Sequence, residues 1–451
     1  MTVRRFLPIL MLCAFLSSQA KAQSASDKAA LKGLAPVTVL GNTPAGNAAL
    51  GANYAVTGGI QNGAIAQPTL LPFAEQQQQA LRDVFITARN LAQLADGLGT
   101  TLEGAYVARA HYIDRQHFTN LSQTLADVIA YANATTSANS GSAKFFFANG
   151  TTDGKTPVAA EVRAILKQNG GSADMFGRAY DLQGGTPGAD PYGNSRPFQT
   201  EPNLTRIIGF DYFHTPADNI VYNRGPMMNL VMSPSYPSGH TTYGYAGAIL
   251  LAMLVPERYP QLMVRAAEYG NDRIIIGAHY AMDVLAGRTL ALYDLAHLLA
   301  NDPAYVAQPF KDVPAISDFQ AAVKKARADM TAALEAGCGN KMEVCAKEDT
   351  GRFSDPATDE AFYAATQTYN LPVVYPKNAG VLEGVAKSAP EAGYLLTIAF
   401  PSLTLEQADE ILTATEGPGG GFLDDGSSFG VYSRLNLYAA AKRAMDVAAA
   451  K

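Results

Sequence analysis

Apolar side chains recur every three or four residues along most of the chain from Glu75 onward, which is the spacing of one buried helical face. The first such stretch contains Leu81, Val84, Phe85 and Leu91, and the spacing resumes after a break at residues 97–99. Later segments that fit the same template are residues 121–132, 159–166, 243–255, 262–269 and 282–299. The pattern therefore predicts a mostly α-helical fold.

Both ends of the chain depart from this pattern. Residues 23–74 are rich in Ala, Gly, Asn and Pro without a sustained period, so we expect a low-complexity, irregular lead-in there. After residue 303 a charged amphipathic helix is predicted over residues 319–335, and short mixed segments follow it. We therefore expect one helical domain over residues 75–300 and an extension over residues 301–451 that supports the domain or controls access to it.

The first 22 residues have the composition of an export signal. Two arginines precede an apolar run from Phe6 to Phe15, and Ala20-Lys21-Ala22 supplies the small residues that signal peptidase requires. The run is well short of the roughly 20 apolar residues that a membrane-spanning helix needs. We expect a signal peptide over residues 1–22 and a periplasmic or secreted protein.

The net charge, the cysteines and the apolar segments each predict or disfavour one property of the protein. Without residues 1–22 the chain has 31 basic and 40 acidic residues, a formal charge of −9, which disfavours nucleic acid as a partner. Cys338 and Cys345 are then the remaining cysteines, and such a pair in an exported chain predicts a local disulfide. Residues 243–255 form the longest later apolar segment and have the length of a buried helix, so no membrane span is expected. The oligomeric state is left open.

The segment Ser235-Tyr236-Pro237-Ser238-Gly239-His240-Thr241 has the pattern of an anion-binding helix start. Pro237 restricts the chain before the helix, Ser238 supplies a capping hydroxyl, and Gly239 leaves space beside the backbone. Backbone N–H groups at a helix start carry partial positive charge and bind phosphate groups. We therefore expect Ser238 and Gly239 to hold a phosphoryl group, and His240 to protonate a leaving-group oxygen.

Residues 272–283 contain a second histidine, followed by a carboxylate four positions later. On a helix, His279 and Asp283 would lie on one face, so the carboxylate could hold one tautomer of the imidazole. The other ring nitrogen of His279 would then be available to attack phosphorus. Arg273 and the distant Arg196 would bind the phosphoryl oxygens through their guanidinium groups.

These segments resemble the superfamily shared by type 2 phosphatidic acid phosphatases, bacterial non-specific acid phosphatases and vanadium haloperoxidases. Its signature is Lys-x6-Arg-Pro, then Pro-Ser-Gly-His, then Ser/Asp-Arg-x5-His-x3-Asp, and residues 237–240 and 272–283 match the last two elements in full. The resemblance extends over roughly residues 75–300, and the residue pattern around His240 looks closest to that of the soluble acid phosphatases. It implies a helical-bundle core of the acid phosphatase/vanadium haloperoxidase type.

The first signature element is incomplete. Arg196-Pro197 is present, but Ala189 stands seven residues before Arg196, where the family has lysine. The site would therefore lack one positive charge unless another cation replaces it. The candidates, which the sequence does not rank, are Arg178, Lys167, Arg206 and Arg224.

The resemblance implies an exported acid phosphatase that hydrolyses small phosphomonoesters through a phosphohistidine. His279 would be the nucleophile, His240 the acid and then the base, and Asp283 the support for His279. No metal or other cofactor is expected, because arginines would supply the positive charge, and activity should be blocked by vanadate and favour acidic pH. One alternative is a vanadate-dependent haloperoxidase, with vanadate as cofactor on His279. The others are a lipid-phosphate phosphatase and a non-catalytic phosphate-binding protein.

His111, Asp114 and His117 are residue types that bind zinc, and they lie close together in the sequence. Their spacing is poor evidence for a metal site, since residues six apart face different sides of a helix. We interpret them as a solvated or locally bonded cluster.

Overall fold

The computed structural model describes residues 23–65, 69–85, 90–201, 204–220, 230–347 and 349–450. Helices dominate these residues, so the mostly α-helical class predicted from the sequence is confirmed. The elements of the first part of the chain are α1 Ala25–Leu34, η1 Ala35–Asn42, α2 Pro44–Gln61, α3 Phe73–Arg82, η2 Ala92–Leu98, α4 Thr100–Val107, α5 Gln123–Asn149, α6 Ala160–Leu166, η3 Gln168–Gly170, α7 Met175–Ala179, α8 Pro197–Thr200, β1 Ile208–Phe210 and β2 Pro216–Asp218. Those of the second part are η4 Leu230–Met232, α10 Gly239–Leu254, η5 Pro256–Arg258, α11 Tyr259–Ile275, α12 Ala281–Leu299, α13 Phe319–Cys338, α14 Met342–Cys345, α15 Pro356–Thr368, α16 Val385–Ser388, η6 Pro390–Gly393, α17 Tyr394–Thr397, α18 Leu405–Ala414, α19 Ser428–Tyr432 and α20 Leu437–Ala449.

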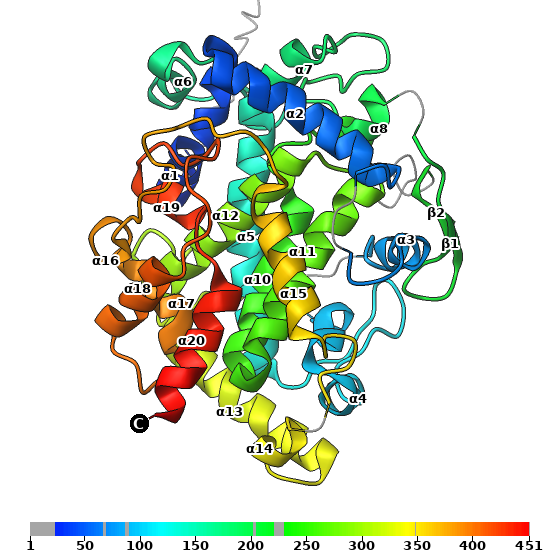
Figure 1. Cartoon of the computed structure of the whole chain (residues 1–451), viewed down its shortest axis with the longest axis vertical. Coiled ribbons are helices and arrows are strands. Elements are labelled where there is room, and N and C mark those ends of the chain that lie inside the picture. The colour runs from blue at the N-terminus through cyan, green and yellow to red at the C-terminus, as the bar shows by residue number, and fades with distance from the viewer. Residues whose placement is uncertain are drawn as a thin grey trace, which may run out of the picture.

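Helices α5, α10, α11 and α12 pack together at the centre of the molecule (Figure 1). Every residue of α10 from His240 to Leu254 is buried, as expected for a helix that is apolar around most of its circumference. Small residues allow the helices to approach closely, since a methyl group at Gly244 would lie only 2.3 Å from the ring of Tyr269 on α11. This packing places the first turn of α10 inside the protein, beside the start of α12.

The expectation of an irregular lead-in over residues 23–74 is wrong, because this segment contains α1, η1 and α2 and begins α3. Ser24 and Asp27 form a capping box at the start of α1, and the Thr43 side chain caps α2. Leu31 of α1 is buried in the main core. Small residues let helices pack closely, but they also weaken the periodic apolar pattern in the sequence. The Ala- and Gly-rich composition therefore concealed these helices.

The extension over residues 301–451 packs on the central helices. α15 and α20 contact α11, and α17 and α19 contact α12. Figure 1 shows α16 to α20 along one side of the molecule. Val431, Tyr432 and Leu437 are fully buried within the core that the extension shares with the preceding helices. The extension therefore covers apolar surface that the central helices would otherwise expose.

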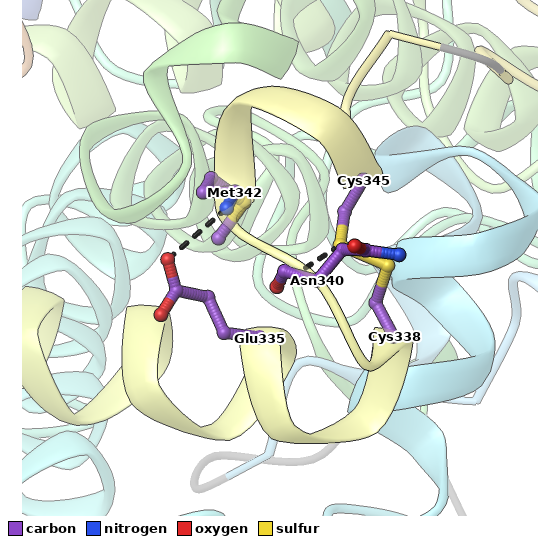
Figure 2. The surroundings of a disulfide bond; sticks show 5 residues. All are labelled: Glu335, Cys338, Asn340, Met342 and Cys345. Carbon is purple, nitrogen blue, oxygen red and sulfur yellow. Dashed lines mark hydrogen bonds between the residues drawn. A yellow bond between two sulfur atoms is a disulfide. The ribbon is translucent and has the colours of Figure 1, made fainter.

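A short loop joins the end of α13 to α14 and is closed at two points (Figure 2). Cys338 and Cys345 lie at disulfide geometry, with their Cα atoms 6.2 Å apart. Beside them, Glu335 Oε1 accepts a hydrogen bond of 3.1 Å from the backbone N–H of Met342. The structure thus brings together the two cysteines that the sequence pairs.

The two strands form an antiparallel pair in which Ile208 lies opposite Asp218. Figure 1 shows this sheet at the edge opposite the C-terminal helices. In the part of the chain that the structure describes, every helix is either too short or too polar to cross a membrane. The predicted signal peptide over residues 1–22 and the candidate cation Arg224 lie outside the described residues.

Candidate active site

Four segments that are distant in sequence bring the predicted site residues together. Arg196 precedes α8, His240 lies in the first turn of α10, Arg273 lies in the last turn of α11, and His279 and Asp283 lie at the start of α12. His240 is 8% exposed, and each of the other four is 1% exposed or less. Chemistry at this point would therefore take place away from bulk water.

The start of α10 has the predicted capping geometry. The Ser238 hydroxyl accepts a hydrogen bond of 3.1 Å from the backbone N–H of Thr241. The backbone N–H of Ser238 donates to the carbonyl of Asp283 at 3.0 Å, which ties α10 to α12. Ser238 is fully buried, whereas Gly239 is partly exposed, so the open side of this turn lies at Gly239.

His279 lies in the loop just before α12, not on a helix with Asp283 as the spacing suggested. Gly277 has a φ of 77°, which residues with side chains rarely adopt, and this conformation turns the chain from α11 toward α12. Asp283 Oδ2 accepts the backbone N–H of Tyr280 at 2.8 Å and lies 3.4 Å from His279 Nδ1. The predicted contact therefore exists, but a loop and a helix start create it.

Ser235 is a further member of this group, and its role was not predicted from the sequence. Its Oγ donates to Asp283 Oδ2 and lies 3.3 Å from His279 Nδ1. The carboxylate and the hydroxyl together hold the Nδ1 side of the ring, which leaves Nε2 as the nitrogen available for the predicted attack. Ser235 belongs to the motif around His240, but only its position in the fold identifies its partners.

The Nε2 atom of His279 faces two other predicted site residues. It lies 3.1 Å from His240 Nδ1 and 3.1 Å from Arg196 Nη1. The ring centroids of the two histidines are 5.3 Å apart. The structure thus gathers the predicted nucleophile, the predicted acid and one predicted arginine at one point.

Arg196 is held by backbone carbonyl groups from two loops. Its Nε donates to Ser233 at 2.7 Å, its Nη1 to Ala278 at 2.9 Å and its Nη2 to Pro234 at 3.2 Å. These bonds join the loop before α10 to the loop before α12. Arg196 therefore braces both loops and adds positive charge beside His279.

Arg273 is fully buried, yet none of its three guanidinium nitrogens has a hydrogen-bond partner among the described residues. Its guanidinium carbon lies 4.7 Å from the ring centroid of Tyr269. A buried cation without hydrogen-bond partners is costly in free energy, and a bound anion would supply both partners and charge. Arg273 therefore indicates an anion-binding position.

Burial and nearby cations lower the pKa of both histidines well below the ordinary value. Burial is the first cause for His240, followed by the charges of Arg273 and Arg196. For His279, burial is followed by the charges of Arg196 and Lys144. In the absence of an anion, both rings are therefore neutral at neutral pH.

Burial also acts on Asp283 and raises its pKa to about 6. Hydrogen bonds from Ser235 and Tyr280 oppose this increase, as do the charges of Lys144 and Arg196. Asp283 is therefore mostly ionised at neutral pH, so its carboxylate favours the tautomer of His279 that carries the proton on Nδ1.

Comparison with known families points to the same region. Residues 189–301 match the PAP2 superfamily. The resemblance predicted from the sequence signature is confirmed over this part of the chain. The PAP2-matched region contains every predicted site residue, from Arg196 to Asp283, whereas α5 lies outside it.

Curated relatives match a short part of this chain. An acid phosphatase of Zymomonas mobilis is 44% identical over 64 residues, which is 14% of this chain and 24% of the relative. A non-specific acid phosphatase of Salmonella typhimurium is 47% identical over 64 residues, which is 14% of this chain and 26% of the relative. A lipid A 1-phosphatase of Rhizobium etli is 34% identical over 87 residues, which is 19% of this chain and 36% of the relative. The similarity thus spans between a quarter and about a third of each relative.

The lysine of the first PAP2 signature element has no counterpart at Ala189. The candidate replacements among the described residues do not contact the site residues. Arg206 is paired with Asp218 at 2.7 Å. Arg178 and Lys167 are exposed. None of these three has a hydrogen bond or ion pair to the site residues in the described structure, so none of the three replaces the lysine.

Lys144 of α5 lies at the site instead, and sequence reasoning missed it. Its Nζ donates to the carbonyl oxygen of Pro234 at 2.8 Å and to that of Ser235 at 3.4 Å. No motif surrounds Lys144 in the sequence, so the packing of α5 against the start of α10 is what reveals it.

The cluster of His111, Asp114 and His117 is locally bonded, as interpreted from the sequence. His117 Nδ1 lies 2.8 Å from Asp114 Oδ2, and His111 Nδ1 lies 3.0 Å from the carbonyl oxygen of Val107. Across the described ranges, no three metal-ligating side chains are grouped as a metal ion would require.

Proposed function

We propose that this protein is an exported phosphatase that hydrolyses phosphomonoesters through a phosphohistidine intermediate. One observation carries the proposal. His279 Nε2 faces His240 Nδ1 at 3.1 Å, and the charge of the buried Arg273 acts on both rings. The guanidinium group of Arg273 has no hydrogen-bond partner among the described residues. Two histidines beside an unpaired buried cation suit phosphoryl transfer, and the acid phosphatases that match part of this chain support the same reaction.

In the first step, His279 Nε2 attacks the phosphorus atom in line with the leaving oxygen. The P–N bond forms while the P–O bond breaks, and protonated His240 gives its proton to the departing alkoxide. Asp283 and Ser235 hold the Nδ1 side of His279, so the lone pair of Nε2 is directed at phosphorus. Arg273 stabilises the negative charge on the phosphoryl oxygens.

In the second step, water attacks the phosphorus atom of the phosphohistidine. His240, now neutral, takes a proton from that water while the P–N bond breaks and inorganic phosphate forms. His240 gives a proton in the first step and takes one in the second, so the site returns to its starting protonation.

The pH dependence follows from the same groups. A bound phosphate dianion raises the pKa of His240, which burial, Arg273 and Arg196 otherwise keep low. The productive state has a protonated His240 and a neutral His279, so we expect activity to favour the acid side of neutrality. Asp283, with its pKa of about 6, limits activity at still lower pH because its protonation weakens the hold on His279.

A trapping experiment tests the nucleophile. Wild-type protein mixed with p-nitrophenyl phosphate and quenched rapidly at alkaline pH, where phosphohistidine survives, should carry a phosphoryl group by intact mass. His240→Ala should accumulate more of it, because p-nitrophenolate can leave without a proton from His240 whereas hydrolysis of the intermediate needs the base. His279→Ala should carry none. Equal labelling of wild type and His279→Ala would show that another residue is the nucleophile.

The charge on the phosphoryl oxygens is neutralised by protein cations in this proposal. Chelators should therefore leave hydrolysis unchanged, and vanadate should inhibit it, because vanadate adopts the trigonal bipyramid of in-line transfer. Loss of hydrolysis in a chelator, with recovery on adding magnesium or zinc, would contradict this part of the proposal.

A lipid phosphate is the second candidate substrate, because the lipid A 1-phosphatase of Rhizobium etli matches 87 residues of this chain. Turnover of p-nitrophenyl phosphate, sugar phosphates, phosphatidic acid and lipid A can be compared under identical conditions. We expect kcat/KM to be higher for the soluble esters, and a consistent preference for the lipids would favour the second candidate.

Export rests on the composition of residues 1–22. When the full chain is expressed in its own host, we expect the protein in the periplasm or medium, with Gln23 as its first residue. Intact protein that retains residues 1–22 in the cytosolic fraction would contradict export.

A further inference from the structure

Lys144 lies on the face of α5 that packs against the loop before α10. Its ammonium group donates to the carbonyl oxygens of Pro234 and Ser235 at 2.8 Å and 3.4 Å. An ammonium group has three N–H donors, and the contacts in the described structure use two of them. The third can bind a further acceptor. Lys144 is partly exposed, unlike Arg196 and Arg273, so its charge lies at the open side of the site.

Lys144 is also close to the backbone that would hold a phosphoryl group. A methyl group built on Gly239 would lie 3.6 Å from Lys144 Cε and 3.5 Å from Ser140 Oγ. Gly239 is the first residue of α10, where backbone N–H groups carry partial positive charge. The ammonium group and the start of α10 therefore border the same space.

The charge of Lys144 acts on the other site residues. It is one of the causes that lower the pKa of His240 and His279, and one of those that oppose the raised pKa of Asp283. Although the Lys144 side chain is partly exposed, desolvation and the charge of Arg196 in turn lower the pKa of Lys144 itself well below the usual lysine value. A phosphoryl dianion would offset the repulsion between these two cations.

We propose that Lys144 binds a phosphoryl oxygen and supplies the positive charge that the first PAP2 signature element provides from a lysine at the position of Ala189. The inference rests on the proposed function, since it assigns a further substrate-binding residue to the same site. The charge comes from α5, some 45 residues earlier in the chain, because α5 lies against α10 at this point. Its ligand is the phosphoryl group of the substrate or free inorganic phosphate.

The test compares three substitutions of Lys144 in the full chain. Lys144→Met removes both the charge and the donors, Lys144→Gln removes the charge but keeps a donor for the loop carbonyls, and Lys144→Arg keeps the charge. Lys155→Met is the matched control, because Lys155 is exposed in the loop after α5. Binding of inorganic phosphate is measured by calorimetry, kcat and KM with p-nitrophenyl phosphate, and folding by thermal unfolding.

We expect Lys144→Met and Lys144→Gln to bind phosphate about 10- to 100-fold more weakly than wild type, the range for losing a hydrogen bond to a charged group. Lys144→Arg should lose less affinity, and Lys155→Met should match wild type. Wild-type affinity in Lys144→Gln would overturn the inference, even if Lys144→Met binds weakly, because Lys144 would then only brace the loop.

The proposed function and the role of Lys144 would be contradicted by different results. If wild-type protein neither binds phosphate nor hydrolyses the ester, the proposed function is wrong. If wild type does both and the neutral variants bind phosphate equally well while remaining folded, the role of Lys144 alone is wrong.

Discussion

The Ser235 hydroxyl is a small group on which the orientation of His279 depends. It donates to Asp283 Oδ2 and lies 3.3 Å from His279 Nδ1. Ser235→Ala should lower kcat about 10- to 100-fold, because it removes a hydrogen bond to a charged group that orients His279, the proposed nucleophile. KM should change little. Steady-state kinetics would check this, with Ser137→Ala on the exposed face of α5 as control, and unchanged kcat would remove Ser235 from the mechanism.

Protonation of His240 should couple to anion binding. Its pKa is lowered by burial, Arg273 and Arg196, and a bound dianion raises it, so binding takes up a proton. Affinity for sulfate, which stays a dianion throughout, should therefore rise as pH falls from about 8 to about 6.5, by at most about tenfold per pH unit. Calorimetric titrations at several pH values measure the slope.

His240→Asn should flatten that slope, since asparagine cannot take up the proton. His111→Asn is the matched control, because His111 is exposed and lies outside the site. A slope that survives in His240→Asn would assign the proton to another group.

At the scale of elements, the close crossing of α12 over the start of α10 sets the position of the predicted anion-binding turn. A methyl group at Gly287 of α12 would lie 2.5 Å from the carbonyl oxygen of Ser238 and 3.0 Å from Thr241 Cβ. Gly287→Ala must therefore displace the turn. We expect a loss of stability of about 1–3 kcal/mol and a fall in kcat/KM of up to about 100-fold, since small displacements of reacting groups are costly.

Gly141→Ala on α5 is the control, because a methyl group there would have no neighbour within 4 Å. It should raise stability by about 0.5–1 kcal/mol, as alanine does in helix interiors, and leave turnover unchanged. Chemical denaturation and steady-state kinetics measure both effects. Wild-type activity in Gly287→Ala would mean that the turn tolerates displacement.

At the scale of the whole molecule, Arg352 of the extension connects two helical elements by ion pairs. It pairs with Glu268 of α11 and with Asp96 of η2, and Glu268 is fully buried. Arg352→Met should destabilise the protein by less than the ~3–5 kcal/mol of a fully buried pair, because Arg352 is partly exposed and Arg265 still faces both carboxylates. Turnover should be unchanged.

Thermal unfolding of Arg352→Met can be compared with that of Lys341→Met, which removes the ion pair between the exposed Lys341 and the partly exposed Glu335. The exposed pair should contribute under ~1 kcal/mol. Equal unfolding temperatures for the two variants would show that the Arg352 network does not stabilise the fold.

Removal of the extension should have a larger effect. Val431, Tyr432 and Leu437 are fully buried in the shared core, so a chain that ends at Asn301 would expose the apolar surfaces that they cover. We expect this truncated chain to lack cooperative unfolding by circular dichroism. A folded truncated chain with unchanged turnover would show that the extension is dispensable.

The amino-acid sequence by itself determined the helical class and most of the site. Helical periods and caps are local, so the helical period over residues 282–299 predicted α12 without knowledge of its neighbours. Likewise, Ser238 could be assigned as a cap because its partner, the N–H of Thr241, is only three residues away. The signature residues His240, His279 and Asp283 could be named because their types and spacing are specific.

The tertiary structure alone decided which distant groups complete the site. Ser235 reaches a carboxylate 48 residues away, and Lys144 bonds to a carbonyl oxygen 90 residues away, so neither contact leaves a local pattern. The spacing of His279 and Asp283 suggested a helical face, whereas the turn at Gly277 and the cap of α12 produce their contact. Contacts of this kind depend on how the helices pack, because packing sets the positions of side chains that the local sequence does not relate to one another.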